Sequence, residues 1–113
     1  MKIENIVNSN GNKVANQFVI KNDRENSLIF QSYNSVVCEV FMNGGLGFEK
    51  AVHFGKNWDY SKTTGKYLHI FLKNYAHISE LTTKKDIQEA INRGYARMNE
   101  SIATLYDETM FLS

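Results

Sequence analysis

The sequence has no proline, a single cysteine and no long apolar run, and each of these absences narrows the class of protein. The lone Cys38 cannot form a disulfide within the chain, which favours a reducing, intracellular compartment. No apolar run approaches the roughly 18–20 residues that cross a bilayer. The first residues also lack the apolar stretch and small-residue cleavage site of a signal peptide. We therefore expect a cytoplasmic protein with no membrane partner.

Net charge is also nearly absent, at +1 from 13 basic and 12 acidic residues. This balance excludes an acidic mimic of DNA and a strongly basic, non-specific nucleic-acid binder. The charge is unevenly distributed, however, because residues 55–78 contain four lysines and only one acidic residue. This segment is where the sequence would attract an anionic partner.

The 113 residues are enough for one domain, and 42% of them are hydrophobic, which allows a core without metals or disulfides. We expect a single domain over 1–113 of the α+β class. Its antiparallel sheet is expected to have four to five strands within about residues 2–54, with two or three helices packed on one face. Apolar alternation and β-branched residues predict strands near 3–7, 15–21, 27–33, 36–42 and 48–54.

The apolar period changes after Tyr60 to steps of three and four residues, which predicts a helix over 61–75 with Ser61 as its N-cap. Gly65 costs about 1 kcal/mol there relative to Ala. This glycine indicates either the close approach of another backbone or a helix that begins later.

A second helix is predicted over 83–93, because Thr83 and Asp86 resemble a capping box. Gly94 is expected to end this helix. Two alternatives remain open for the segment 95–113, a third short helix and, at residues 95–98, a return to the sheet. Most of the core is expected to come from Phe18, Ile20, Leu28, Phe30, Val37, Val52, Phe54, Trp58, Tyr67, Leu68, Phe71, Leu72, Ile87 and Ile91.

Motifs that signal catalysis or a cofactor are weak in this sequence. Gly65-Lys66 resembles the end of a phosphate-binding loop but lacks its first glycine and its metal-binding hydroxyl. The three histidines lack the spacing of a helical metal site, and Cys38 lies among valines that do not stabilise a thiolate. We expect no catalytic residues, no metal and no cofactor, and hence no enzyme. An enzyme whose site forms by tertiary contacts is a third hypothesis, and it would gather His53 or His77 with carboxylates in a pocket.

Residues 56–73 combine aromatic rings and lysines more densely than any other segment. Such a mixture can stack bases and neutralise phosphates, or can contact a protein partner. The alternative is that Trp58 and Tyr67 anchor the helix to the sheet while the lysines are solvated. The candidate partner-binding residues are Lys56, Trp58, Tyr60, Lys62, Lys66 and Lys73.

Three segments carry a resemblance: Asn16-Gln17-Phe18, the FQSYNS of residues 30–35, and the WDYSKTTGKY of residues 58–67 with Phe71-Leu72 after it. Over about residues 16–94 the pattern resembles a small uncharacterised domain family of bacteriophages and low-GC bacteria. That family has no established activity and gives no residue a role.

The resemblance implies a biological context, because small accessory proteins of phages and mobile elements often bind and block host machinery, including CRISPR effectors. The leading hypothesis is therefore a phage- or mobile-element-encoded, anti-CRISPR-like inhibitor. It would bind a host defence protein in the host cytoplasm without catalysis. The alternative is a small nucleic-acid-binding module that uses the lysines and aromatic rings of residues 56–73.

Overall fold

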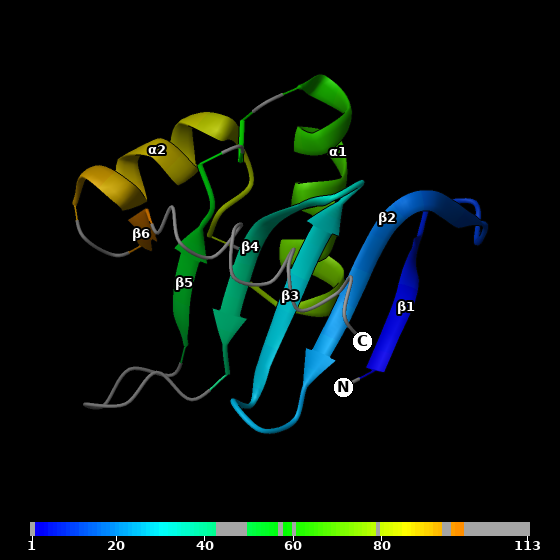
Figure 1. Cartoon of the computed structure of the whole chain (residues 1–113). Helices are drawn as coiled ribbons and strands as arrows, with labels where there is room; N and C mark the ends of the chain where they lie inside the picture. The colour runs from blue at the N-terminus through cyan, green and yellow to red at the C-terminus, as the bar shows by residue number, and fades with distance from the viewer. Residues whose placement is uncertain are drawn as a thin grey trace.

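The computed structural model describes residues 2–42, 50–56, 58–59, 61–78 and 80–93, and the backbone of 96–98. Among these residues, six strands form one sheet in sequence order (Figure 1). Along the chain, two helices come after the fifth strand and before the sixth. The strands are β1 (Lys2–Val7), β2 (Lys13–Asn22), β3 (Ser27–Ser32), β4 (Ser35–Phe41), β5 (Ala51–Phe54) and β6 (Ala96–Met98). The helical elements are α1 (Lys62–Ile70), its π-helical continuation η1 (Phe71–Tyr75), and α2 (Lys84–Asn92).

Strands β1 to β5 pair antiparallel, each with the next, so the predicted antiparallel sheet with helices is confirmed. Gly11, in the turn between β1 and β2, has a φ of 82°, a conformation that glycine adopts at little cost. The sixth strand, β6, pairs parallel to β5. Its direction follows from the long helical connection between the two strands. A return to the sheet is thus the correct alternative for 96–98, and the residues that follow lie outside the described part of the chain.

Both helices begin where their capping residues predict. Ser61 Oγ accepts a hydrogen bond from the Thr64 amide at 3.1 Å, and Thr83 forms a capping box with Asp86 at the start of α2. Each cap satisfies amide groups that a helix leaves without a partner in its first turn. The predicted stop at Gly94 lies outside the described residues.

The main core lies between one face of the sheet and the helices. In Figure 1, α1 passes behind β3 and β4, and Phe71 of η1 stacks on Phe30 of β3 with 5.6 Å between the ring centroids. The fully or nearly buried members of this cluster are Ile6, Val19, Phe30, Val37, Cys38, Val40, Val52, Phe54, Trp58, Leu68, Phe71, Leu72, Ala76, Ile78, Ile87 and Ala90. Leu28, Tyr67 and Ile91, which the sequence places in the core, are only partly buried against it.

The expectation for Phe18 and Ile20 is corrected by the strand register. Val19 pairs with Phe30 and belongs to the main core. Because side chains alternate along a strand, its neighbours Phe18 and Ile20 point to the opposite face. Ile20 is buried there in a separate cluster with Ile29 and Val36, whereas Phe18 is only half-buried.

Candidate binding cleft between the two helices

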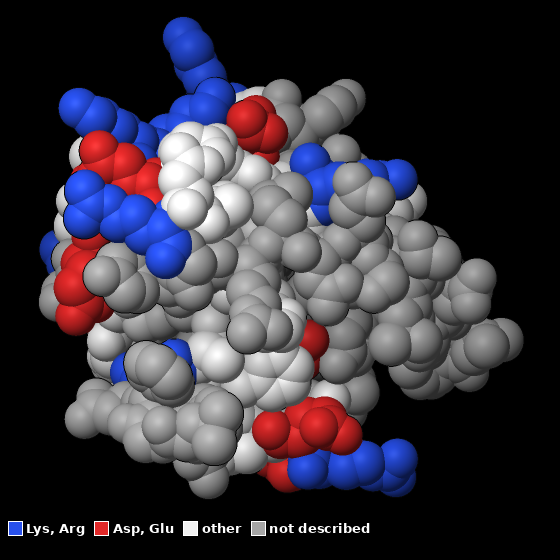
Figure 2. Space-filling view, turned by 90° about the vertical axis from the view of Figure 1, so that its left-hand side faces the viewer, with Lys and Arg blue, Asp and Glu red and all other residues white. Residues whose placement is uncertain are grey.

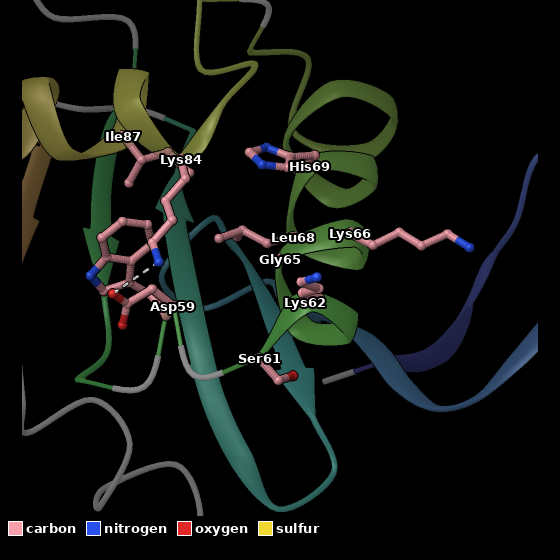
Figure 3. A pocket seen from close by; sticks show the side chains of 10 residues that line it. Asp59, Ser61, Lys62, Gly65, Lys66, Leu68, His69, Lys84 and Ile87 are labelled. Atoms are coloured by element: carbon pink, nitrogen blue, oxygen red, sulfur yellow. Dashed lines mark ion pairs between the residues drawn. The ribbon is translucent and has the colours of Figure 1, made fainter.

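A cleft opens between the N-terminal part of α1 and the first turn of α2 (Figure 3). Its cavity volume is about 490 Å³, within the range of roughly 300–1,000 Å³ that is usual for ligand pockets. We call it the interhelical cleft, and its lining residues are Trp58, Asp59, Ser61, Lys62, Gly65, Lys66, Leu68, His69, Lys84 and Ile87.

The floor of the interhelical cleft is apolar. Trp58 is 5% exposed, Leu68 1% and Ile87 0%, so these three side chains are held by the core and are not free to rearrange. The Trp58 ring packs against Phe54 of β5 with 5.7 Å between centroids. The base of the cleft is thus part of the core, with Trp58 packed on β5 and Leu68 and Ile87 buried in α1 and α2.

Charged side chains surround this floor. Lys84 Nζ lies 3.7 Å from Asp59 Oδ2, and both side chains are substantially exposed, at 70% and 45%. An exposed ion pair of this kind contributes only about 0–1 kcal/mol, so Lys84 can exchange its partner at little cost. Lys62 and Lys66 are exposed on α1. Three lysines and one aspartate are among the lining residues, which makes the rim of the cleft basic, although the Lys66 side chain extends away from α2 (Figure 3).

The wider surface beside α2 carries charges of both signs. In the view onto the α2 side (Figure 2), basic side chains project from the upper end and acidic side chains lie among them. The excess of positive charge is thus a property of the cleft itself and does not extend over this whole face.

His69 projects from α1 toward α2 across the cleft (Figure 3). Its Nδ1 atom is buried and, among the described residues, has no hydrogen-bond partner. A buried polar atom without a partner destabilises a fold by about 1–3 kcal/mol.

Gly65 borders the cleft in the second turn of α1. A Cβ atom placed on it meets no atom of the described residues within 4 Å. No backbone of the described residues approaches Gly65 closely. The expectation of a helix that begins later is wrong, because α1 already starts at Lys62. Gly65 leaves this wall of the cleft open.

The residues predicted to bind a partner divide into three groups. Lys62, Lys66 and Trp58 line the cleft, although Trp58 is buried and offers no exposed ring face. Lys56 and Lys73 are exposed but do not line the cleft. Tyr60 lies outside the described residues.

The alternative interpretation of residues 56–73 describes their rings well. Trp58 and the half-buried Tyr67 pack against the core, while Lys62, Lys66 and Lys73 face the solvent. The ammonium group of Lys66 lies 5.4 Å from the centroid of the Tyr67 ring. The segment thus combines anchoring rings with exposed charges.

Sequence reasoning assigned no binding role to the rest of the lining. Lys84 and Ile87 come from α2, and no local pattern relates them to residues some 25 positions earlier. His69, which the sequence analysis considered only as a metal ligand, is half-buried in the lining. The signal in the sequence was the helix-destabilising glycine at position 65, which was interpreted as the approach of another backbone or as a later start of the helix.

The remaining chemically interesting side chains lie in the sheet. Cys38 is buried, as predicted, and burial together with the nearby Glu39 charge raises the pKa of its thiol well above the usual value, which disfavours the reactive thiolate. Glu39 is 2% exposed and accepts a hydrogen bond from Ser27 Oγ at 2.7 Å. His53 lies opposite Glu39 in the register of β4 and β5. None of these residues lines the interhelical cleft.

Comparison with known proteins yields one match. A sequence model described as a family of unknown function (DUF8033) matches residues 1–89, a range that contains the whole lining of the interhelical cleft. No curated protein and no solved structure matches the chain. Among the described residues, no helix is long and apolar enough to span a membrane.

Proposed function

We propose that this chain, which belongs to the family of unknown function DUF8033, is a binding protein whose partner is another protein. The proposal is drawn from the surface that the structure presents. The interhelical cleft is the contact site, and the protein acts by occupying its partner without catalysing a reaction. The observation that carries this proposal is the cavity of about 490 Å³ between the two helices, with exposed lysines at its rim.

This arrangement is typical of protein-binding surfaces. Affinity at such surfaces comes mainly from side chains that fill preformed pockets, and the interhelical cleft offers a cavity of about 490 Å³. Peripheral charges steer the encounter and select the partner, and Lys62 and Lys66 are placed to do this. The partner surface should accordingly be acidic around an apolar projection.

In its specific form, the proposal is that a phage or mobile element encodes the protein. It would bind and inhibit a host defence protein in the host cytoplasm, as an anti-CRISPR protein does. The support for this form is the sequence resemblance at residues 16–94 together with the small size of the chain. In this proposal, the cleft is the surface with which the inhibitor contacts its target.

Photo-crosslinking in cells tests the contact site. A benzoylphenylalanine in place of Lys62 should crosslink a discrete host protein, identified by mass spectrometry. The same group in place of Tyr33, which is 57% exposed and lies in the turn between β3 and β4, is the matched control. Equal crosslinking from both positions, or from neither, would contradict the proposal.

Phage plating tests the inhibitor role. In a host with an active CRISPR system that targets the phage, expression of the protein should restore plaque formation. A variant with Lys62→Glu and Lys66→Glu should lose this effect while remaining folded, since both side chains are exposed. Unchanged plating with the wild-type protein, for every defence system assayed, would remove the specific form of the proposal.

A second candidate, nucleic-acid binding, is favoured by the lysines of the first helix. Lys62, Lys66 and Lys73 are separated by four and seven residues, spacings that place side chains on one side of a helix. Such binding should weaken by about one order of magnitude per tenfold rise in salt for each phosphate contact. Fluorescence anisotropy with a labelled oligonucleotide, titrated at several salt concentrations, measures this slope, and no binding at low salt would exclude it.

A further inference from the structure

The face of the sheet that points away from the helices, here called the second face, is buried at its centre. Ile20, Ile29 and Val36 form a cluster there that is separate from the main core, and they are 1%, 0% and 0% exposed. We call these three residues the second-face cluster. Glu39, which pairs with Ile29 in the strand register, is 2% exposed. A sheet face in contact with water leaves part of each side chain exposed, so this burial requires a cover.

The described helices do not supply this cover. The buried and half-buried apolar residues of α1, η1 and α2 belong to the main core, and in Figure 1 α1 passes behind the sheet. The second-face cluster contains strand residues alone. The cover therefore comes from outside the described part of the chain.

We propose that the C-terminal segment, residues 99–113, binds the second face of its own chain and covers the second-face cluster. Large apolar side chains are frequent in this segment, namely Ile102, Leu105, Tyr106, Met110, Phe111 and Leu112. Such side chains gain free energy when they leave water for an apolar surface. This contact lies on the opposite side of the sheet from the interhelical cleft, and the inference does not rest on the proposed function.

The strand register starts the C-terminal segment at the level of the cluster. Met98, the last residue of β6, pairs with Phe54 of β5, and the same row continues through Cys38, Phe30 and Val19. The members of the second-face cluster lie one or two positions from this row along β2, β3 and β4. A chain that leaves β6 and turns across the strands therefore passes over the cluster.

The length of the segment fits the distance to be covered. Neighbouring strands lie about 4.8 Å apart, so the path from β6 to β2 is about 19 Å. The residues 99–113 span about 22 Å as a helix and about 50 Å when extended, so either conformation reaches β2. The burial ends at the same place, because Ile20 of β2 is 1% exposed whereas its register partner Ile3 on β1 is 53% exposed. An open cavity of about 190 Å³ between these two residues marks the boundary.

The loop between β4 and β5, residues 43–49, fits the cover less well. It is tied at both ends beside the pair of Phe41 and Ala51, so its backbone extends at most about 14 Å from that pair. Val36 lies five residues from Phe41 along β4, at about 17 Å. Even fully extended, the loop would reach Val36 only with its tip and would leave Ile20 of β2 uncovered.

Photo-crosslinking in the purified full-length protein tests the contact directly. Benzoylphenylalanine in place of Tyr106 should attach to residues of β2, β3 or β4 within the same chain, located by mass spectrometry of the monomer. The same group in place of Lys73, which is exposed on η1, is the matched control and should not attach to the second face.

Two double variants separate loss of the cover from unfolding. Ile102→Asp with Leu105→Asp should detach the segment, and Ser101→Asp with Thr104→Asp adds the same charge at polar neighbours. In methyl NMR spectra with a soluble gadolinium chelate, the methyl signals of the second-face cluster should broaden severalfold more in the first variant than in the wild type or the second. The methyl signals of Leu72, which is 0% exposed in the main core, should stay protected and thus verify the fold.

Four results would overturn the inference. These are crosslinks from position 106 that avoid the second face, a cluster that stays protected in the first variant, equal broadening in both double variants, and a covalent dimer from position 106. The dimer would assign the second face to a second copy of the chain. If the first variant unfolds, so that Leu72 also loses protection, the crosslinks from position 106 decide the matter.

Discussion

Replacement of Gly65 by alanine should stabilise the protein. In the interior of a helix, alanine is favoured over glycine by about 0.8–1.0 kcal/mol, because glycine loses more backbone freedom on folding. The gain is realised in full only where the new methyl group meets no obstacle, and no described atom lies within 4 Å of the added Cβ. We therefore expect the free energy of unfolding to rise by about 1 kcal/mol.

Urea denaturation measures this change. Trp58 is the only tryptophan and is buried, so its fluorescence reports unfolding, with circular dichroism as a second probe because Trp58 borders the altered cleft. For a slope of roughly 1–3 kcal/mol per molar urea, a gain of about 1 kcal/mol moves the midpoint upward by about 0.3–1 M. The melting temperature should rise by about 4 °C.

Two other glycines provide controls of opposite sign. Gly11→Ala should destabilise by about 1–2 kcal/mol, because its φ of 82° is unfavourable for residues with a Cβ. Gly55→Ala should destabilise by about 1–3 kcal/mol or more, since its Cβ would meet the Val36 carbonyl oxygen at 2.4 Å. If Gly65→Ala also lowered stability, this wall of the cleft would not be open.

Three further outcomes are expected. Phe71→Ala should lower the free energy of unfolding by about 3–5 kcal/mol, because the ring is fully buried and stacks on Phe30 at 5.6 Å; unchanged urea curves would contradict the packing of η1 on the sheet. The pKa of Asp86 is lowered, chiefly by the hydrogen bond from the Thr82 hydroxyl. The stabilising contribution of the carboxylate should therefore be present above about pH 4 and be lost as the pH falls through the lower folded-state pKa. The difference in melting temperature between wild type and Asp86→Ala should shrink over that range. The Cys38 thiol, buried and with a raised pKa, should resist iodoacetamide in the folded protein at neutral pH and react after denaturation; rapid labelling of the native state would refute this.

The sequence predicts the local structure well where one residue type decides it. Ser61 and Thr83 have side chains that accept the free amides of a helix start, and both helices begin there. The strand register is harder to predict, because it depends on which residues of neighbouring strands meet. Phe18 and Val19 are both apolar, and only the pairing of Val19 with Phe30 decides which of them faces the helices.

The cleft could be predicted only in part. Lys62 and Lys66 are evident from the charge pattern of residues 55–78, since a helix with an apolar stripe exposes what lies off that stripe. Lys84 and Ile87 reach the same cavity through the packing of α2, which no local pattern encodes. The sequence shows that Gly65 destabilises the helix, but only the structure shows that no described atom lies within 4 Å of a Cβ added there.

The roles of rings and lysines in residues 56–73 decide how this surface can bind. Trp58 and Tyr67 pack in or against the core, so these two rings anchor the segment. Lys62 and Lys66 remain exposed among the lining residues of the cleft, and in the proposed function they would favour an acidic partner surface. Substitution of Trp58 by alanine should therefore reduce stability, by about 3–5 kcal/mol, and affect binding only through the loss of the cleft floor.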